Sequence, residues 1–171
     1  MKTIDKSLTP YSFYKMSFED QLRNSHMSLL GEFDFYKHTM ERRRQLLLAA
    51  DPSWAVLETK LLSVGGETVC YSAEPHLAEI VERGTVFPGK SRSIKGIPSH
   101  CHGNVSVLWY EIEDFQIVTG WALTKDGMWR QHSWGRIGGI LTIETTMKRS
   151  KYFGFILNDS EAKDFAKQNP Y

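Results

Sequence analysis

The strongest constraint on the fold is a series of short strand patterns separated by turn signals in the C-terminal half of the chain. Residues 115–123 alternate well enough for a strand, and Asp126-Gly127 is a strong signal for a two-residue hairpin turn. Further segments have strand character, and these are residues 128–134, 140–146 and 152–157. The sequence therefore predicts a meander of about four antiparallel strands.

Helical patterns surround these strands. They combine helix-forming composition, helical spacing and capping residues, and they cover residues 33–50, 52–64, 75–83, 102–113 and 160–168. Asn158 or Asp159 is the expected cap of the last helix. We therefore predict an α+β fold with a mostly helical N-terminal half, residues 1–84. In residues 85–171 a helix is expected to pack on an antiparallel sheet of about four strands, and the two parts to form one compact domain.

Residues 84–101 have the composition of a loop, because they contain three glycines and two prolines. Lys90, Arg92 and Lys95 make this segment basic. The basic side chains could meet an anionic ligand, although a solvated surface is the commoner role of such a cluster.

The charge balance argues against a nucleic-acid-binding protein. The chain has 21 Lys and Arg and 20 Asp and Glu, a formal net charge of +1, whereas such proteins usually carry a strong basic excess. No stretch approaches the roughly 20 apolar residues of a membrane-spanning helix, and the first residues lack the apolar segment of a signal peptide. Two cysteines, Cys70 and Cys101, are too few for a disulfide framework, so we expect reduced thiols and a cytoplasmic location. No phosphate-binding glycine motif indicates a nucleotide cofactor.

One short segment, residues 99–104, combines features of a nucleophilic site. It places Cys101 at the junction between the glycine-rich loop and a predicted helix, where free N–H groups and the helix dipole favour a thiolate. Ser99 and Asn104 flank the cysteine and could bind an oxyanion or the substrate. A buried, unreactive thiol is the usual fate of a free cysteine, and Cys70 fits that interpretation better than Cys101.

A base for this thiol is found on the predicted strands. His132 lies mid-strand, and Glu144 lies on the next strand. If residues 137–139 form a three-residue loop, the two side chains are directly opposite each other, with Cβ atoms about 4.5–5.5 Å apart. A two-residue loop would instead pair His132 with Leu141, so the spacing permits the pair without requiring it. A histidine that is merely structural is the alternative.

Four of the five tryptophans lie near these residues. We expect Trp109 and Trp121 to belong to the core, and either Trp129 or Trp134 to form a wall of a pocket.

The order of a cysteine at a helix start, a histidine on a strand and an acidic residue on the neighbouring strand resembles the papain-like superfamily, in particular its NlpC/P60-like and transglutaminase-like branches. The resemblance covers roughly residues 98–157. It implies a thiol hydrolase or acyltransferase that needs no cofactor, with Cys101 as nucleophile, His132 as base and Glu144 as orienting residue. The implied substrate is a peptide, a protein or a small amide. Glutamate in the third place departs from the commoner residues, and no glutamine shortly precedes the cysteine to serve the oxyanion.

Two other functions remain open at this point. His100, Cys101 and His102, together with His132, are zinc-competent side chains, although their spacing matches no common zinc motif. Alternatively, the protein is a non-catalytic binding module or inhibitor whose N-terminal helical half contacts the partner. Cys101→Ala separates the enzyme from the binding module, because only the enzyme should lose its function.

Overall fold

The computed structural model describes residues 39–88 and 90–170. The chain divides into two compact units, Met1–Arg42 and Arg43–Tyr171, and the fold below is that of the second. Residues 39–50 are helical, in agreement with part of the helix predicted for residues 33–50. The rest of that prediction lies outside the described residues.

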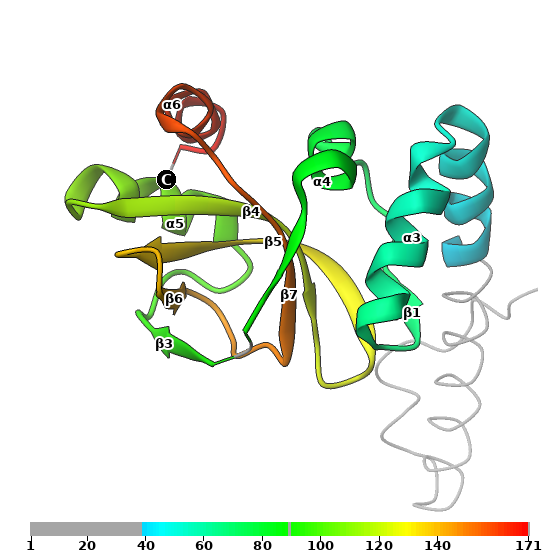
Figure 1. Cartoon of the computed structure of the whole chain (residues 1–171), viewed down its shortest axis with the longest axis horizontal. Helices are drawn as coiled ribbons and strands as arrows, with labels where there is room; N and C mark the ends of the chain where they lie inside the picture. Colours follow the sequence, from blue (N-terminus) through cyan, green and yellow to red (C-terminus); the bar gives the residue numbers. More distant parts are fainter. Residues whose placement is uncertain (1–38, 89, 171) are drawn as a thin grey trace, which may run out of the picture. The chain divides into compact units, whose positions relative to one another are not determined.

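The second unit combines one sheet with helices placed before, between and after its strands (Figure 1). The strands are β1 (Thr68–Val69), β2 (Thr85–Phe87), β3 (Ser91–Ser93), β4 (Phe115–Leu123), β5 (Met128–Ile137), β6 (Leu141–Glu144) and β7 (Lys151–Ile156). The helices that follow residue 50 are α3 (Ser53–Val64), α4 (Leu77–Arg83), α5 (Cys101–Glu111) and α6 (Asp159–Gln168).

The predicted fold, a helical N-terminal half followed by a four-stranded antiparallel sheet, is wrong. Within the described residues the sheet has seven strands in the order β2-β7-β4-β5-β6-β3, with β1 pairing β5 beside this path. It is mixed, because β1 runs parallel to β5 and β3 runs parallel to β6. It is not a simple meander either, since β7 returns to pair with β4 instead of continuing beside β6. The segment predicted as a loop, residues 84–101, contributes the edge strands β2 and β3.

The sheet is curled into a half-barrel. Strands β6 and β7 are separated by β4 and β5, so in a flat sheet they would lie about 14 Å apart. Nevertheless the hydroxyl of Tyr152 on β7 donates to the Glu144 carboxylate on β6 over 2.9 Å. On the same concave face the ring of Phe87, from β2, packs on Trp134 of β5, with ring centroids 5.5 Å apart.

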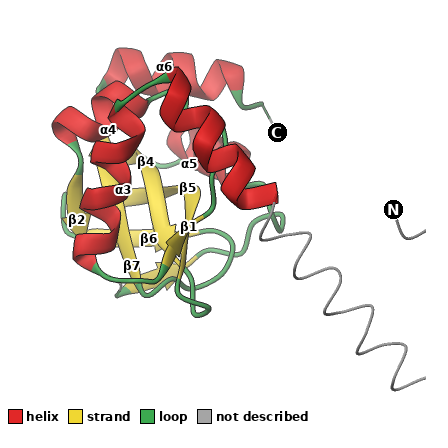
Figure 2. Cartoon of the chain, turned by 90° about the vertical axis from the view of Figure 1, so that its right-hand side faces the viewer, coloured by secondary structure: helices red, strands yellow, loops and turns green. Residues whose placement is uncertain are grey.

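Helices cover the other, convex face. Trp54 of α3 contacts Trp121 of β4 edge-on, and His76, which precedes α4, contacts Phe155 of β7. In Figures 1 and 2, α4 and α6 lie on the same side of the strands. The two faces of the sheet therefore have different surroundings, one of helices and one formed by the curl of the sheet itself.

Glycines make room on the concave face. Gly120 of β4 lies between His132 of β5 and Gly154 of β7 in the strand register. A Cβ atom at Gly154 would lie 2.3 Å from the Thr119 carbonyl oxygen and 2.8 Å from the ring of Trp134. The absence of a side chain at Gly154 therefore lets the Trp134 ring lie close to the backbone, and the absence of one at Gly120 lets β4 and β7 approach each other closely.

Several element boundaries agree with the sequence. Strand β4 spans the predicted residues 115–123. Helix α6 begins after Asn158, whose side chain accepts from the Glu161 N–H while Glu161 bonds back to the Asn158 N–H, a capping box. Among the described residues, no helix has the length and apolar character needed to cross a membrane.

Candidate active site

Cys101 is the first residue of α5 and is half-buried. The segment before it runs along β6, because the Ile94 N–H donates to the Glu144 carbonyl and the Gly96 N–H donates to the Thr145 carbonyl, both over 2.9 Å. These bonds bring the start of α5 to the end of β6, where Glu144 lies.

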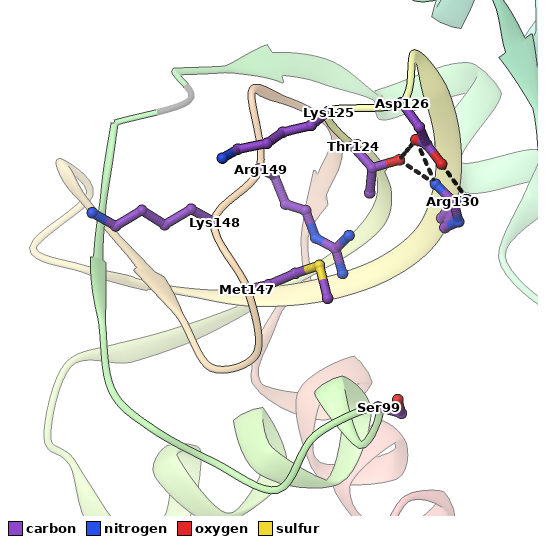
Figure 3. Close-up of a pocket in the computed structure, with 8 residues that line it drawn as sticks. All are labelled: Ser99, Thr124, Lys125, Asp126, Arg130, Met147, Lys148 and Arg149. Atoms are coloured by element: carbon purple, nitrogen blue, oxygen red, sulfur yellow. Dashed lines mark hydrogen bonds and ion pairs between the residues drawn. The ribbon is translucent and has the colours of Figure 1, made fainter.

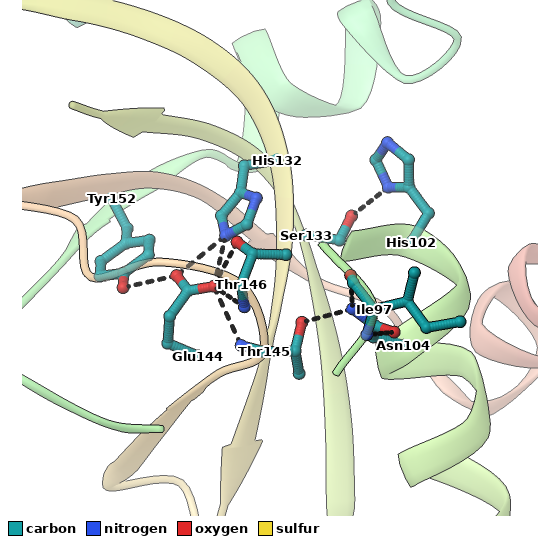
Figure 4. A network of polar contacts seen from close by, with 9 residues as sticks. All are labelled: Ile97, His102, Asn104, His132, Ser133, Glu144, Thr145, Thr146 and Tyr152. Carbon is teal, nitrogen blue, oxygen red and sulfur yellow. Dashed lines mark hydrogen bonds and ion pairs between the residues drawn. The ribbon is translucent and has the colours of Figure 1, made fainter. Parts of the chain in front are cut away.

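The side chain of Asn104 fixes the turn into the helix. Its Oδ1 accepts from the Ile97 N–H over 3.0 Å, and its Nδ2 donates to the Ile97 carbonyl over 2.9 Å (Figure 4). The turn also contains Ser99, a non-glycine residue with a positive φ of 63°. The backbone thus enters α5 in a constrained conformation that sets the position of Cys101.

His132 points from β5 into the concave face and is 1% exposed. Its Nε2 lies 2.9 Å from Oε2 and 3.2 Å from Oε1 of Glu144. Its ring stacks on Trp134 and on Tyr152, with interplanar angles of 19° and 24°. The imidazole also interacts with the neighbouring Cys101 thiol, and this interaction shifts the pKa of both groups. Since Nε2 faces the carboxylate, Nδ1 is the nitrogen left for the thiol.

The register that brings His132 and Glu144 together is not the predicted one. Ile137 pairs with Leu141 and Gly135 with Ile143, so the three-residue loop is residues 138–140 and not 137–139. Continuing this register places Glu144 opposite Trp134, which makes His132 and Glu144 a diagonal pair. The shift amounts to two residues along one strand, and a shift of two leaves both side chains on the same face.

Glu144 is 1% exposed, and protein donors surround its carboxylate. Oε1 accepts from the Thr145 N–H, the Thr146 N–H and the Thr146 hydroxyl, each over 2.9 Å. Oε2 accepts from the Tyr152 hydroxyl and faces His132 (Figure 4). A buried carboxylate with this many donors can remain ionised.

The electrostatics favour a charged pair at Cys101 and His132. Burial raises the pKa of the Cys101 thiol, but the hydrogen bond and charge of His132 lower it by more, with help from backbone N–H groups, so the net pKa lies below its usual range. Burial lowers the pKa of His132, but its bonds to Cys101 and Glu144 raise it above its usual value. Burial also raises the pKa of Glu144, and the contacts with His132 and other donors bring it down to about 2.

The remaining candidate residues lie elsewhere or have other partners. Both ends of the Asn104 amide are bound to Ile97, and Ser99 is exposed on the turn before α5. Trp129 is fully buried, and its Nε1 donates to the Gly65 carbonyl. Trp134 is also fully buried, but it lies against His132 and so supports the imidazole. Trp121 is buried as expected, whereas Trp109 is only half-buried and does not belong to the buried core.

The three histidines considered for zinc point to different partners. His100 bonds the Pro98 carbonyl, His102 bonds the Ser133 hydroxyl, and His132 lies between Glu144 and Cys101. Within residues 39–88 and 90–170, no three His, Cys, Asp or Glu side chains are grouped as a metal site.

Sequence reasoning did not identify the role of a second, half-buried imidazole beside the cysteine, that of His102. His102 Nδ1 lies 2.8 Å from the Ser133 hydroxyl, which in turn donates to the Thr119 hydroxyl over 3.1 Å. Burial and the positive charge of His132 lower the pKa of His102 to about 4. The sequence did hold one signal for this contact. Ser133 follows His132 on β5, so its side chain points to the opposite face of the sheet, which α5 covers.

The chain matches no protein-family model, and no curated protein and no solved structure is significantly similar to it. The functional argument therefore rests on the geometry described above.

Proposed function

We propose that this protein is a cysteine-nucleophile hydrolase or acyltransferase that acts on an amide, isopeptide or thioester bond. In this proposal Cys101 is the nucleophile, His132 the acid and base, and Glu144 the residue that orients the imidazole. The observation that carries the proposal is the position of His132 between a buried carboxylate and a thiol at the start of a helix. This is the arrangement that activates a nucleophile through an oriented base.

The first half of the reaction forms an acyl-enzyme. The Cys101 thiolate attacks the substrate carbonyl carbon, and a carbonyl electron pair moves to oxygen to give a tetrahedral oxyanion. The oxyanion collapses and expels the leaving amine or thiol, which takes its proton from the His132 imidazolium. The acyl group is then held on Cys101 as a thioester, and His132 is neutral.

The second half releases the acyl group. Water, or an amine or thiol in the transfer reaction, attacks the thioester carbonyl while neutral His132 takes its proton. The acid or the transferred product leaves, and the Cys101 thiolate and the His132 imidazolium are restored. The Glu144 carboxylate stays ionised throughout, because its pKa is about 2.

Backbone donors support the developing negative charge. The carbonyl of His100 accepts from the Asn104 N–H, so the N–H groups of residues 101–103 precede the first hydrogen bond of α5. Such first-turn donors can bind an oxyanion next to the nucleophile without a glutamine side chain.

An activated acetate ester tests the proposal without knowledge of the substrate. We expect p-nitrophenyl acetate to give a burst of nitrophenolate and an acetyl group on Cys101, found by mass spectrometry after an acid quench. Cys101→Ala should abolish both signals, and the matched variant Cys70→Ala should keep them. Acetylation spread equally over both cysteines, or none at Cys101 in a folded protein, would overturn the enzyme and favour a non-catalytic binding protein.

A further inference from the structure

A cavity of about 670 Å³ is lined by residues that lie a few positions from the proposed triad in the chain. Figure 3 shows that its walls come from the hairpin between β4 and β5 and from the loop between β6 and β7, with Ser99 across the opening. The charged lining residues are Lys125, Asp126, Arg130, Lys148 and Arg149. The cavity is therefore lined by four cationic side chains and one carboxylate, although the whole chain is almost neutral.

The single carboxylate pairs with only one of these four cations. Asp126 is bound to Arg130 by two hydrogen bonds of 2.9 and 2.7 Å. Among the described residues, no carboxylate forms an ion pair with Lys125, Lys148 or Arg149. The Nε of Arg149 is moreover buried and has no hydrogen-bond partner in the described part of the chain. The side chains of Lys125, Lys148 and Arg149 thus line a space that an anion could occupy.

None of the three triad residues lines the cavity, but each is close in the chain to a residue that does. Arg130 lies two residues before His132 on the same face of β5, which is about 7 Å along the strand. Ser99 lies two residues before Cys101. Lys148 and Arg149 lie in the loop that begins directly after Glu144, and Thr146 of this loop donates to the Glu144 carboxylate.

We infer that the acyl substrate of Cys101 is anionic, a peptide or peptide-like compound with a carboxylate close to the bond that is attacked. This inference rests on the proposed function and adds the substrate class. The guanidinium and ammonium groups at the cavity provide the charge and the donors that a carboxylate needs. Because these cations are close to the nucleophile, they raise the local concentration of anionic substrates at Cys101.

Two alkylating reagents of nearly the same shape test the inference on the full chain. Iodoacetamide is neutral, and iodoacetate carries a carboxylate; each forms a carbon–sulfur bond with the thiolate and releases iodide. We expect the ratio of the iodoacetate rate to the iodoacetamide rate to be about threefold or more higher at Cys101 than at Cys70 in the same sample. The excess should decrease with added salt.

Charge reversal provides the matched comparison. Lys148→Glu and Arg149→Glu should each lower the ratio at Cys101 by about threefold or more, because each replaces a cation of the cavity with an anion that repels iodoacetate. Any change in the thiolate fraction affects both reagents equally and cancels in the ratio. Lys163→Glu changes the net charge equally but lies exposed on α6, outside the cavity lining, and should leave the ratio unchanged.

The outcomes separate the inference from the proposed function. If both reagents alkylate Cys101 rapidly at pH 6 but the ratio equals that at Cys70 in every variant, the anionic substrate is overturned and the nucleophile stands. If Cys101 reacts with neither reagent faster than Cys70 at this pH, the proposed function fails and the inference fails with it.

Discussion

Each face of strand β5 holds an imidazole near Cys101, and the pKa values of the two imidazoles are shifted in opposite directions. On the concave face His132 contacts the Glu144 carboxylate, and its pKa is raised. On the face covered by helices His102 contacts the Ser133 hydroxyl, and its pKa is lowered to about 4. Burial lowers the pKa of both rings, so burial alone does not explain the difference.

The partner of each imidazole decides its charge. An ionised carboxylate offsets the cost of burying a protonated ring, whereas a hydroxyl supplies only a dipole. Only His132 can therefore carry the positive charge that stabilises the Cys101 thiolate near neutral pH. His102 is neutral there, and its role is to pack and to bond Ser133.

The largest effect on stability is expected for Glu144→Gln. The carboxylate has an ordinary pKa of 4.5 and a folded value of about 2, a difference worth about 3 kcal/mol. Because the folded pKa is lowered, this stabilisation is present above pH 4.5 and is lost as the pH falls toward 2. Urea unfolding at several pH values should show this acid dependence in the wild type and a much weaker one in the variant. An equal dependence in both proteins would contradict the role assigned to Glu144.

A smaller loss is expected for Gly154→Ala, which tests the space on the concave face. The new methyl group would meet the Thr119 carbonyl and the Trp134 ring, at a cost of about 2 kcal/mol. Gly138→Ala is the control: its φ is 58° and nothing lies within 4 Å, so it should cost about 1 kcal/mol from backbone strain alone. Thermal unfolding measures both changes, and equal losses would show that the concave face tolerates a side chain.

The smallest effect is expected for His102→Gln. Because the folded pKa of His102 is lowered from 6.5, its neutral form stabilises the fold above pH 6.5, and this is lost as the pH falls toward 4. In the variant, the free energy of unfolding should fall by about 1 to 2 kcal/mol less than in the wild type over this pH range. This value is reduced for the partial exposure of the ring. Alkylation of Cys101 at pH 6 should stay within about threefold of the wild type. A fall in the alkylation rate as large as that of a His132 variant would show that His102 also activates the Cys101 thiol.

The sequence carried much of the local structure and part of the site. The alternation in β4 and the cap at Asn158 are local features, and both were predicted with nearly the observed boundaries. The placement of Cys101 at a helix start was also predicted, because a change from glycine-rich loop to helical spacing marks such a boundary.

The long-range pairings could not be read from the sequence. Strands β2 and β3 are three residues long, and their pairing with β7 and β6 depends on the curl of the whole sheet. The predicted hairpin register was wrong because several loops that contain Gly138 and Gly139 are compatible with the sequence. In the structure both glycines adopt a positive φ within the loop, and the sequence alone does not single out this loop. The cation-lined cavity was missed because its residues come from two loops that are distant in the sequence.

The central claim is the charged pair of Cys101 and His132, and the pH dependence of iodoacetamide alkylation tests it most directly. Peptides with Cys101 and Cys70 are quantified separately in the wild type and in His132→Ala, so that Cys70 serves as the internal reference. An ordinary thiol titrates near pH 8.5. We predict that wild-type Cys101 reacts rapidly below pH 7 and that His132→Ala lowers its rate at pH 6 about a hundredfold. A Cys101 that follows the profile of an ordinary thiol in both proteins would contradict the charged pair.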